Sequence, residues 1–301
     1  MTAIARQRAV PTAVTRERRS RLPRALLHAF LISVSILWLF PLLWAIYQSF
    51  RPFTETAAAP VALPQTLTLD NYTNAFERME GFKYFFNTIV IVVPAMAVVL
   101  LLACGIAFAV SRFSWRFNLA LLMLFTAGNL LPPQVIITPL FRIYLALPLP
   151  EVLNDKGLWY DSYFGIAMIH IAFQLGFCTF VLSNYMKTLP KELVEAALVD
   201  GASVLRTFWQ VILPLCRPPL AALATLQFTW MYNDFFWALV LMPTGAKRPV
   251  TSALNNLQGQ FFSDTNLLAA GSVLIALPTL IVYFALQKQF VRGLTLGSTK
   301  G

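Results

Sequence analysis

Charged residues are scarce in this sequence. They make up 12% of its 301 residues, whereas hydrophobic residues make up 58%. A water-soluble domain normally has about a quarter of its residues charged. The scarcity therefore excludes a single soluble core and predicts a protein that crosses a membrane several times.

Cysteine and histidine are also rare, and their positions exclude two kinds of site. The three cysteines, at 104, 178 and 216, lie in or beside apolar stretches, so we expect small buried side chains and no disulfide framework. His28 and His170 stand far apart and outside any cluster of metal-binding spacing, so no metal site is predicted. A structural role is expected for both, and the alternative for His170, with Gln174 one turn later, is a polar pathway.

Further absences concern chemistry and energy supply. The sequence has no Gly-x-x-x-x-Gly-Lys-Ser/Thr loop, since residues 297–300 have the wrong order, so this chain is not expected to bind ATP. No paired carboxylates or Ser/His arrangement indicate an enzyme. Asp234 is the only acid well inside an apolar stretch. A transporter driven by protons or sodium usually needs several such groups, which argues against that class.

Long apolar stretches are abundant, and they set the predicted fold. A membrane-spanning helix needs about 20 mostly apolar residues. Six stretches qualify, at residues 26–48, 85–110, 119–141, 163–184, 220–241 and 267–287. The sequence thus predicts an all-α membrane protein with six transmembrane helices.

The basic residues indicate an orientation in the membrane. The segment before the first stretch carries one acid, Glu17, and seven arginines, at positions 6, 8, 16, 18, 19, 21 and 24. By the positive-inside rule this N-terminus is cytoplasmic, and six crossings return the C-terminus to the same side. The formal charge of +10 is then explained by topology, and no nucleic-acid partner is expected.

These predictions divide the chain into four parts. Residues 1–25 would form a basic cytoplasmic tail, and residues 26–84 the first transmembrane helix with an external loop. Residues 85–288 would form the transmembrane core, and residues 289–301 a cytoplasmic tail.

Residues 191–214 form a polar segment between the fourth and fifth stretches. Residues 191–199 are mostly good helix formers, and Gly201 stands where a left-handed residue would end a helix. Ser203 is placed to begin a second helix, which we expect Pro214 to close. Two short helices joined at a glycine would make a protrusion suited to the groove of a soluble partner. The alternative is an ordinary amphipathic segment at the membrane surface.

The same segment resembles the cytoplasmic coupling loop of binding-protein-dependent ABC importers. The residues that carry the resemblance are Glu195, Ala196, Ala197, Gly201, Val211, Leu213 and Pro214. Val211 stands where isoleucine is more usual, and Leu198 where a basic residue is frequent. The resemblance implies a coupling loop at 188–214 that docks on an ATPase subunit through Glu195, Ala196, Ala197, Asp200, Gly201, Leu213 and Pro214.

Two other segments resemble carbohydrate permeases of the maltose type. The first is the region of Trp230, Asn233, Asp234, Phe235 and Trp237, although two residues separate Trp230 from Asn233. The resemblance implies a substrate pathway or gate that includes Tyr232, Asn233, Asp234 and Trp237. The alternatives are a hydrogen bond that packs helices and an aromatic belt at the membrane interface. The second is the tail 289–301, in which Gly293, Leu294, Thr295 and Gly297 would contact the ATPase.

The resemblance also implies an assembly. The chain would pair with a second homologous permease subunit, two ATP-binding subunits that hold ATP and magnesium, and an external solute-binding protein. It would bind no cofactor itself and would import a di- or oligosaccharide across a bacterial or archaeal plasma membrane. The alternatives are an ABC permease for glycerol 3-phosphate or another polyol-like solute and, from a different class, an ion-coupled secondary transporter.

Overall fold

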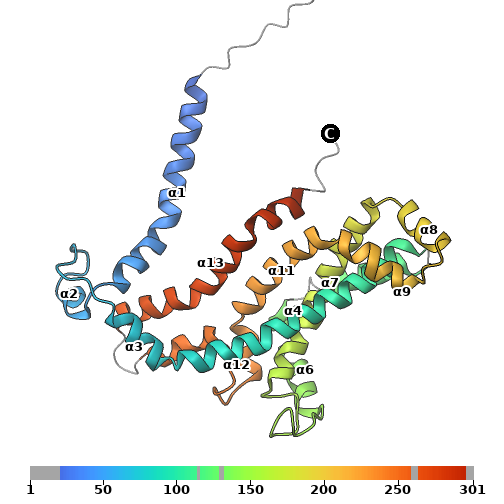
Figure 1. Cartoon of the computed structure of the whole chain (residues 1–301). Helices are drawn as coiled ribbons and strands as arrows, with labels where there is room; N and C mark the ends of the chain where they lie inside the picture. Colours follow the sequence, from blue (N-terminus) through green and yellow to red (C-terminus); the bar gives the residue numbers. More distant parts are fainter. Residues whose placement is uncertain (1–20, 114–115, 129–131, 259–263, 296–301) are drawn as a thin grey trace, which may run out of the picture. The chain divides into compact units, whose positions relative to one another are not determined.

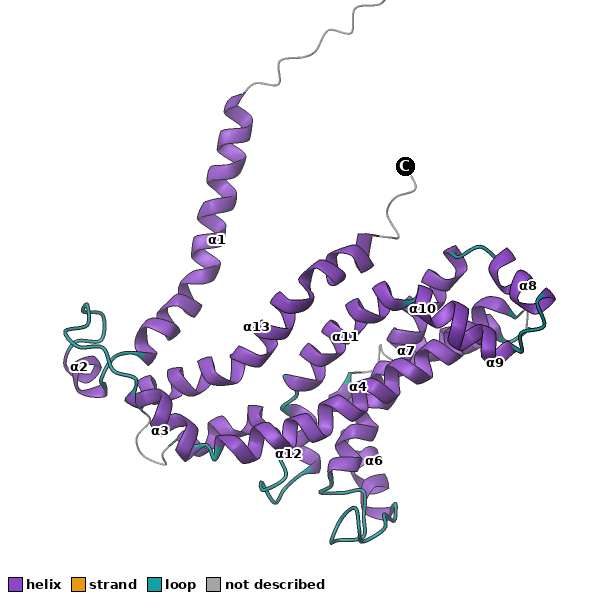
Figure 2. Ribbon diagram, viewed as in Figure 1, coloured by secondary structure: helices purple, strands orange, loops and turns teal. Residues whose placement is uncertain are grey.

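The computed structural model describes residues 21–113, 116–128, 132–258 and 264–295. The chain forms two compact units, residues 1–45 and 46–301. The described residues contain helices and no strand, apart from an isolated antiparallel bridge between Pro148 and Leu158 (Figures 1 and 2). The predicted helical class is confirmed for this part of the chain.

The first unit consists, in its described part, of most of helix α1 (Arg21–Ser49). The helix contains Pro41, and apolar side chains surround its whole circumference. A helix that is apolar on all sides is suited to lipid or to a buried position.

The second unit is built around two long helix pairs (Figure 1). Helix α4 (Gly81–Arg112) packs along α7 (Tyr163–Thr188), and α11 (Arg217–Tyr232) packs along α13 (Thr265–Thr295). On α4, Ala95, Val99, Ala103 and Ala107 recur every fourth residue and are fully buried. Small residues at this spacing let membrane helices approach closely, which explains the extensive α4–α7 contact.

Short elements connect these helices. They are α2 (Phe53–Ala58), α3 (Asp70–Arg78), α5 (Asn118–Gly128), α6 (Pro133–Ala146), α8 (Glu192–Val199), α9 (Val204–Thr207), the π-helical turn η1 (Phe208–Ile212), α10 (Leu213–Leu215), α12 (Phe236–Leu241) and the 3₁₀ helix η2 (Val250–Leu257).

Four predicted spans, 26–48, 85–110, 163–184 and 267–287, are confirmed as long apolar helices. Over 119–141 the structure describes two helices, α5 and α6, bent by 97°, so this stretch is a broken span or a re-entrant loop. Pro132 has an extended backbone and precedes Pro133, and a residue before proline is disfavoured in a helix. The described residues thus include four helices suited to cross a membrane, or up to six if each bent pair is one span.

The fifth predicted span, 220–241, is also not one helix. Helix α11 ends at Tyr232, and α12 begins only at Phe236. The last predicted span agrees with the candidate span Thr265–Lys288, and helix α13 continues beyond it to Thr295. The proposed ATPase-contacting residues Gly293, Leu294 and Thr295 therefore belong to its last turn, and Gly297 lies outside the described residues.

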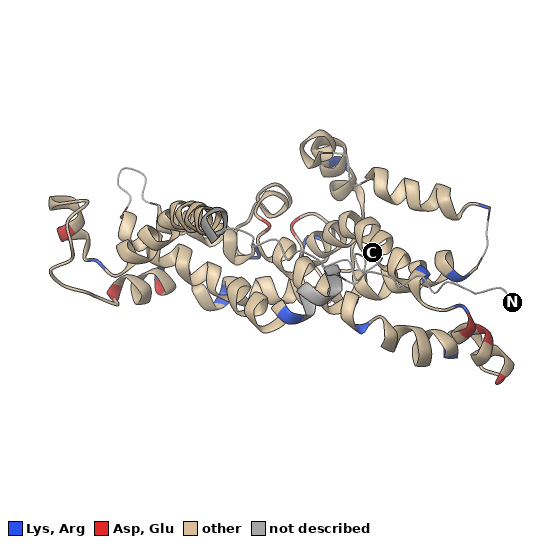
Figure 3. Cartoon of the chain, turned by 90° about the horizontal axis from the view of Figure 1, so that it is seen from above, with Lys and Arg blue, Asp and Glu red and all other residues tan. Residues whose placement is uncertain are grey.

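Side-chain hydrogen bonds to carbonyls define two ends of this bundle. At one end, Asn87 Nδ2 donates to the carbonyls of Ala246 and Arg248 at 3.0 and 2.9 Å. At the other end, Arg112 donates to the carbonyls of Met186 and Leu189 at 2.7 and 3.2 Å. Acidic residues gather on the segment with α2 and α3 and on α8, while the long helices are largely uncharged (Figure 3). Helix α4 therefore runs between two ends that both carry acidic residues (Figure 3).

Candidate functional site

The first candidate site is a protrusion formed by α8 and α9. Gly201, between them, has φ of +79° and terminates α8. Its N–H donates to the Leu198 carbonyl at 3.0 Å, and the Ala202 N–H donates to the Ala197 carbonyl at 2.9 Å. This pair of bonds is a Schellman motif, in which a left-handed residue reverses the chain. The predicted role of Gly201 as the end of the first helix is confirmed.

The second helix of the protrusion begins at the predicted residue. Ser203 Oγ accepts a hydrogen bond from the Arg206 N–H at 3.3 Å and so caps α9. The helical segment ends at Leu215, one residue after the predicted end at Pro214. The turn before Pro214 widens into the π-helical η1, where the Leu213 N–H donates to the Phe208 carbonyl. The widened turn accommodates a residue that has no N–H of its own.

The protrusion ends at Cys216. There the helical segment Val204–Leu215 meets α11 at an angle of 73°. Helix α11 carries proline in its first turn, where the missing N–H costs no helical hydrogen bond. Leu213 and Pro214 are half-buried and lead into this bend. Leu213 and Pro214 therefore lie apart from the exposed residues that were predicted to contact the ATPase subunit.

The exposed part of the protrusion combines acids and apolar side chains. Glu195, Ala196, Asp200 and Gly201 are exposed, and Ala197 is half-buried. The apolar side chains of Val199, Leu205 and Trp209 are 87%, 66% and 47% exposed. Isolated apolar residues are common on protein surfaces, but a group of this kind indicates an interaction site.

The base of the protrusion is fixed to the bundle. Phe208 and Ile212 are buried, and the Phe208 ring lies 5.3 Å from the ring of Phe108 on α4. Arg112, also on α4, holds the carbonyls at the end of α7 that leads into the protrusion. A displacement of the protrusion would consequently be felt by α4, α7 and α11 together.

The second candidate site is the break between α11 and α12. The Asp234 carboxylate accepts hydrogen bonds from the N–H groups of Trp237 and Ala238 at 3.3 and 3.4 Å. Asn233 Nδ2 donates to the Thr229 carbonyl at 2.9 Å. The bonds to Asp234 satisfy N–H groups in the first turn of α12, which have no helical partners, as an irregular backbone in a membrane requires. The Thr229 carbonyl also accepts the Asn233 N–H at 3.1 Å.

His170 of α7 lies opposite this break. Its Nε2 is 3.8 Å from Asp234 Oδ2, and the His170 side chain is buried. Two aromatic pairs extend the contact between α7 and the broken helix, with ring centroids 5.3 Å apart: Phe173 with Trp237, and Phe177 with Trp230. The sequence shows each of these residues but not their pairing across helices.

The predicted pathway residues are only partly brought together. Asn233 is exposed, Asp234 is near the surface with 11% of its side chain accessible, and Trp237 is buried. Tyr232 faces another way, since its hydroxyl donates to the Ile275 carbonyl on α13 at 2.9 Å. A pocket of about 250 Å³ lies beside Phe173, between α5, α6 and α7. Among the described residues, no group of three side chains is suited to hold a metal ion.

Comparisons with known proteins agree with this geometry. Residues 101–296 match the family model of the binding-protein-dependent transport system inner membrane component. A probable ABC transporter permease of Pyrococcus horikoshii is 34% identical over 87% of this chain and 92% of its own length. The diacetylchitobiose uptake permease NgcG of Streptomyces coelicolor is 31% identical, over 91% of this chain and 88% of its own length.

The fold also has a solved counterpart. It is a crystal structure of a bacterial ABC transporter involved in the import of the acidic polysaccharide alginate. The matching chain has a TM-score of 0.76 at 23% identity, with 91% of this chain and 98% of that chain covered. At this identity the likeness establishes a common fold.

Proposed function

Because the chain belongs to the family of binding-protein-dependent transport system inner membrane components, we propose that it is a permease subunit of an ATP-driven carbohydrate importer. The observation that carries this proposal is the protrusion of α8 and α9. It presents exposed apolar and acidic side chains at one end of the bundle while its base is buried against α4.

The protrusion would act as the coupling element. Val199 and Leu205 would enter a groove of an ATPase subunit, with Glu195 and Asp200 at the rim. Two such subunits would bind ATP and magnesium, and their closure would displace the protrusion. Since Phe208 and Arg112 connect it to α4 and α7, the displacement would tilt both helices and open the path on the other side of the bundle.

The proposed substrate is a di- or oligosaccharide. Two similar proteins support this class: one relative is a diacetylchitobiose uptake permease, and the structural counterpart belongs to a transporter involved in alginate import. Aromatic rings beside a hydrogen-bonding break suit a sugar, which has apolar ring faces and hydroxyl groups. The site between α7 and the break would be completed by a second permease subunit, and the solute would arrive on an external binding protein at the plasma membrane.

The test is uptake by the assembled transporter in proteoliposomes. Wild-type complex should take up labelled oligosaccharide only with ATP on the protrusion side and binding protein on the other. The double variant Glu195→Arg, Gly201→Asp should lose uptake and still insert into the membrane. Glu151→Arg, an exposed acid in a loop at the opposite end, is the matched control and should transport normally. Wild-type uptake by the double variant would refute coupling through the protrusion.

A further inference from the structure

We propose that α3 and the start of α4 form a binding site for a zwitterionic phospholipid, phosphatidylethanolamine. One acyl chain would lie in an apolar pocket, and the headgroup would lie among the charged residues beside it. The proposal requires only that the chain is an integral membrane protein, so it goes beyond the proposed function and does not depend on it. It follows from what lines the pocket, how its walls are held and which charges adjoin it.

The pocket between α3 and α4 has apolar walls. It has a volume of about 310 Å³ and is lined by Phe76 of α3 and by Phe82, Phe85, Phe86 and Ile89 of α4. This volume lies at the lower end of the range for small-molecule pockets, about 300–1,000 Å³. Because these side chains have no hydrogen-bond donor or acceptor, a sugar or a peptide would lose its hydrogen bonds to water without replacement. A hydrocarbon chain has no such bonds to lose and fits this lining.

The walls of the pocket are held by the fold itself. Helix α3 lies beside the start of α4 (Figure 1). The centroid of the Phe76 ring is 6.3 Å from those of both Phe82 and Phe85. A Cβ on Gly81 would lie 2.5 Å from the Phe76 ring, so glycine at this position lets the ring lie against α4. Met79, which follows α3, is fully buried and fixes that helix. A ligand therefore meets a preformed pocket.

The pocket lies where α4 passes from a charged to an apolar environment. Between Lys83 and Arg112 the helix carries no charged residue, so Lys83 marks its entry into the apolar layer. Ile89 lies six residues further, about 9 Å along the helix axis. Phe82, Phe86 and Ile89 are 84%, 63% and 58% exposed, which leaves the pocket accessible from the side of the helix. The pocket thus extends from the headgroup region into the acyl-chain region.

The charged residues that adjoin the pocket in the sequence balance one another. From 71 to 90 they are Glu77, Arg78, Glu80 and Lys83, and all four are exposed. Lys83 Nζ lies 2.7 Å from the Glu80 carboxylate, and an exposed ion pair of this kind is weak enough for both partners to turn to a headgroup. Two acids and two bases suit a headgroup that has a phosphate to accept hydrogen bonds and an ammonium to donate them. Phosphatidylethanolamine has both groups, whereas phosphatidylcholine has no N–H and phosphatidylglycerol no cation.

The test maps lipid contacts of the full-length chain, assembled with its partners, in nanodiscs of phosphatidylglycerol. The probe is a trace of phosphatidylethanolamine that carries a photoreactive diazirine in one acyl chain. After illumination, peptide mass spectrometry locates the adducts. We expect them to concentrate on residues 76–89, above the level on the exposed apolar residues of α13. Added phosphatidylethanolamine should reduce these adducts more than the same amount of phosphatidylcholine does.

Two pairs of variants separate the pocket from the charges. Ile89→Trp fills the pocket and should lose most adducts on residues 76–89. Ile281→Trp, at a residue 64% exposed on α13, is the matched control and should keep them. Lys83→Glu should lose the preference for phosphatidylethanolamine over phosphatidylcholine. The exchange Glu80→Lys, Lys83→Glu keeps the balance of charge and should retain that preference.

Four results would overturn the proposal. Equal adduct levels on α4 and α13 would show that the lipid contact is general. Few adducts on residues 76–89 would show that another protein segment covers the pocket. Unchanged adducts in Ile89→Trp would place the acyl chain elsewhere, and equal competition by the two added lipids would refute the headgroup assignment. Each of these results would leave the proposed function untouched, since none of them measures uptake.

Discussion

At the scale of single residues, the polar side chains of the described helices mostly serve the backbone. Thr225 and Thr229 each donate to the carbonyl one turn earlier, at 2.9 and 2.8 Å. Asp234 accepts hydrogen bonds at the start of α12, and Asn233 donates to the Thr229 carbonyl near the end of α11. In a lipid environment each unpaired backbone group costs several kcal/mol. The first role of these polar side chains is therefore to stabilise the fold.

We predict that Asp234 contributes through its hydrogen bonds more than through its charge. Asp234→Ala should destabilise the protein by about 1 kcal/mol, the usual cost of a lost helix cap. Asp234→Asn keeps an acceptor oxygen for the Trp237 and Ala238 N–H groups and should be close to wild type. Thermal unfolding in detergent measures both variants. Equal destabilisation by the two substitutions would contradict this assignment.

Gly201 permits a second prediction at this scale. No heavy atom beyond its immediate neighbours would meet an added Cβ within 4 Å, so the φ of +79° is the main obstacle to other residues. Gly201→Ala should cost about 1–2 kcal/mol locally and loosen the end of α8. Gly201→Asn should cost less, because asparagine tolerates the left-handed region.

Hydrogen exchange of the α8 amides measures the loosening of α8 in the Gly201 variants. Uptake of labelled oligosaccharide by the assembled transporter measures the effect on transport. Gly245→Ala is the matched control, since Gly245 has φ of +76° with equally open surroundings but lies in a different loop. It should leave α8 protection unchanged. Faster exchange in α8 caused by the control would point to global destabilisation and would contradict a local role.

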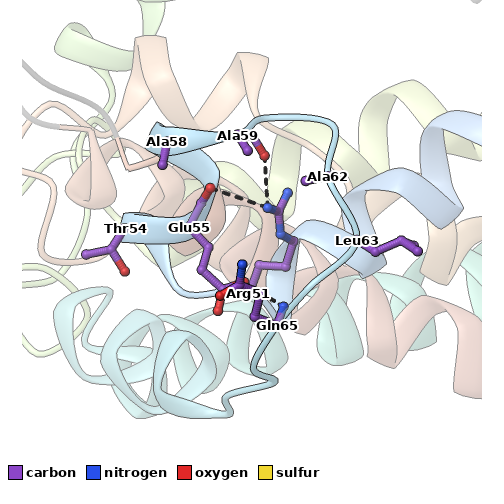
Figure 4. A pocket seen from close by; sticks show the side chains of 8 residues that line it. All are labelled: Arg51, Thr54, Glu55, Ala58, Ala59, Ala62, Leu63 and Gln65. Atoms are coloured by element: carbon purple, nitrogen blue, oxygen red, sulfur yellow. Dashed lines mark hydrogen bonds between the residues drawn. The ribbon is translucent and has the colours of Figure 1, made fainter.

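At the scale of elements, short segments act as rigid units because charged groups close them. Residues 51–69, here called the α2 loop, are closed by Arg51 and Glu55 (Figure 4). Phe208 joins the protrusion to α4, and Arg112 of α4 holds the end of α7 that leads into the protrusion. Neither the α2 loop nor the protrusion has a large core of its own. Their order depends on a few strong hydrogen bonds, and this makes them sensitive to pH or to single substitutions.

We predict that the α2 loop loosens in acid. Hydrogen bonds from the Thr66 hydroxyl and from the Gln65 and Thr66 N–H groups lower the pKa of Glu55. A carboxyl whose pKa is lowered by folding stabilises the folded form above its ordinary pKa of about 4.3 and loses this effect as pH falls through the folded-state value. The loop should therefore be fully held at pH 7 and progressively released below about pH 4.

Hydrogen exchange of residues 61–66, corrected for the intrinsic pH dependence, measures this release. Glu55→Gln should show weaker protection already at pH 7 and no acid transition. An acid transition of unchanged size in Glu55→Gln would assign the effect to another group.

At the scale of the whole molecule, the two ends of the second unit carry different structural elements. One end holds the α2 loop and the loops around Asn87, and the other holds the protrusion. Between them the acids are few (Figure 3), and α4 runs from the side of α3 to the protrusion (Figure 1). This separation suits a protein that receives a solute on one side and an energy input on the other.

We predict that the two ends lie on opposite sides of the membrane. Val152 and Val199 are 96% and 87% exposed, and α7 lies between them in the chain. Val152→Cys should react with a membrane-impermeant maleimide in intact spheroplasts, and Val199→Cys only after permeabilisation. The unsubstituted chain, whose cysteines are buried, is the control. Labelling of both variants from outside would contradict the topology and place the protrusion away from any cytoplasmic ATPase.

The amino-acid sequence by itself determined the long elements and the local signals. Apolar length predicts four confirmed helices, because a helix that faces lipid must be apolar over its whole span. Gly201 and Ser203 predict a helix end and a helix start, because these depend on the backbone and side chain of one residue.

The tertiary structure alone decided where apolar stretches break and which polar groups meet. A stretch such as 220–241 has the same hydropathy whether it is one helix or two, and at the break after Asn233 the Asp234 carboxylate accepts hydrogen bonds from the first turn of the next helix. The pairing of His170 with Asp234, and of Arg51 with carbonyls up to nine residues away, depends on the path of the chain between them. Local composition does not encode such paths, since they result from packing of distant segments.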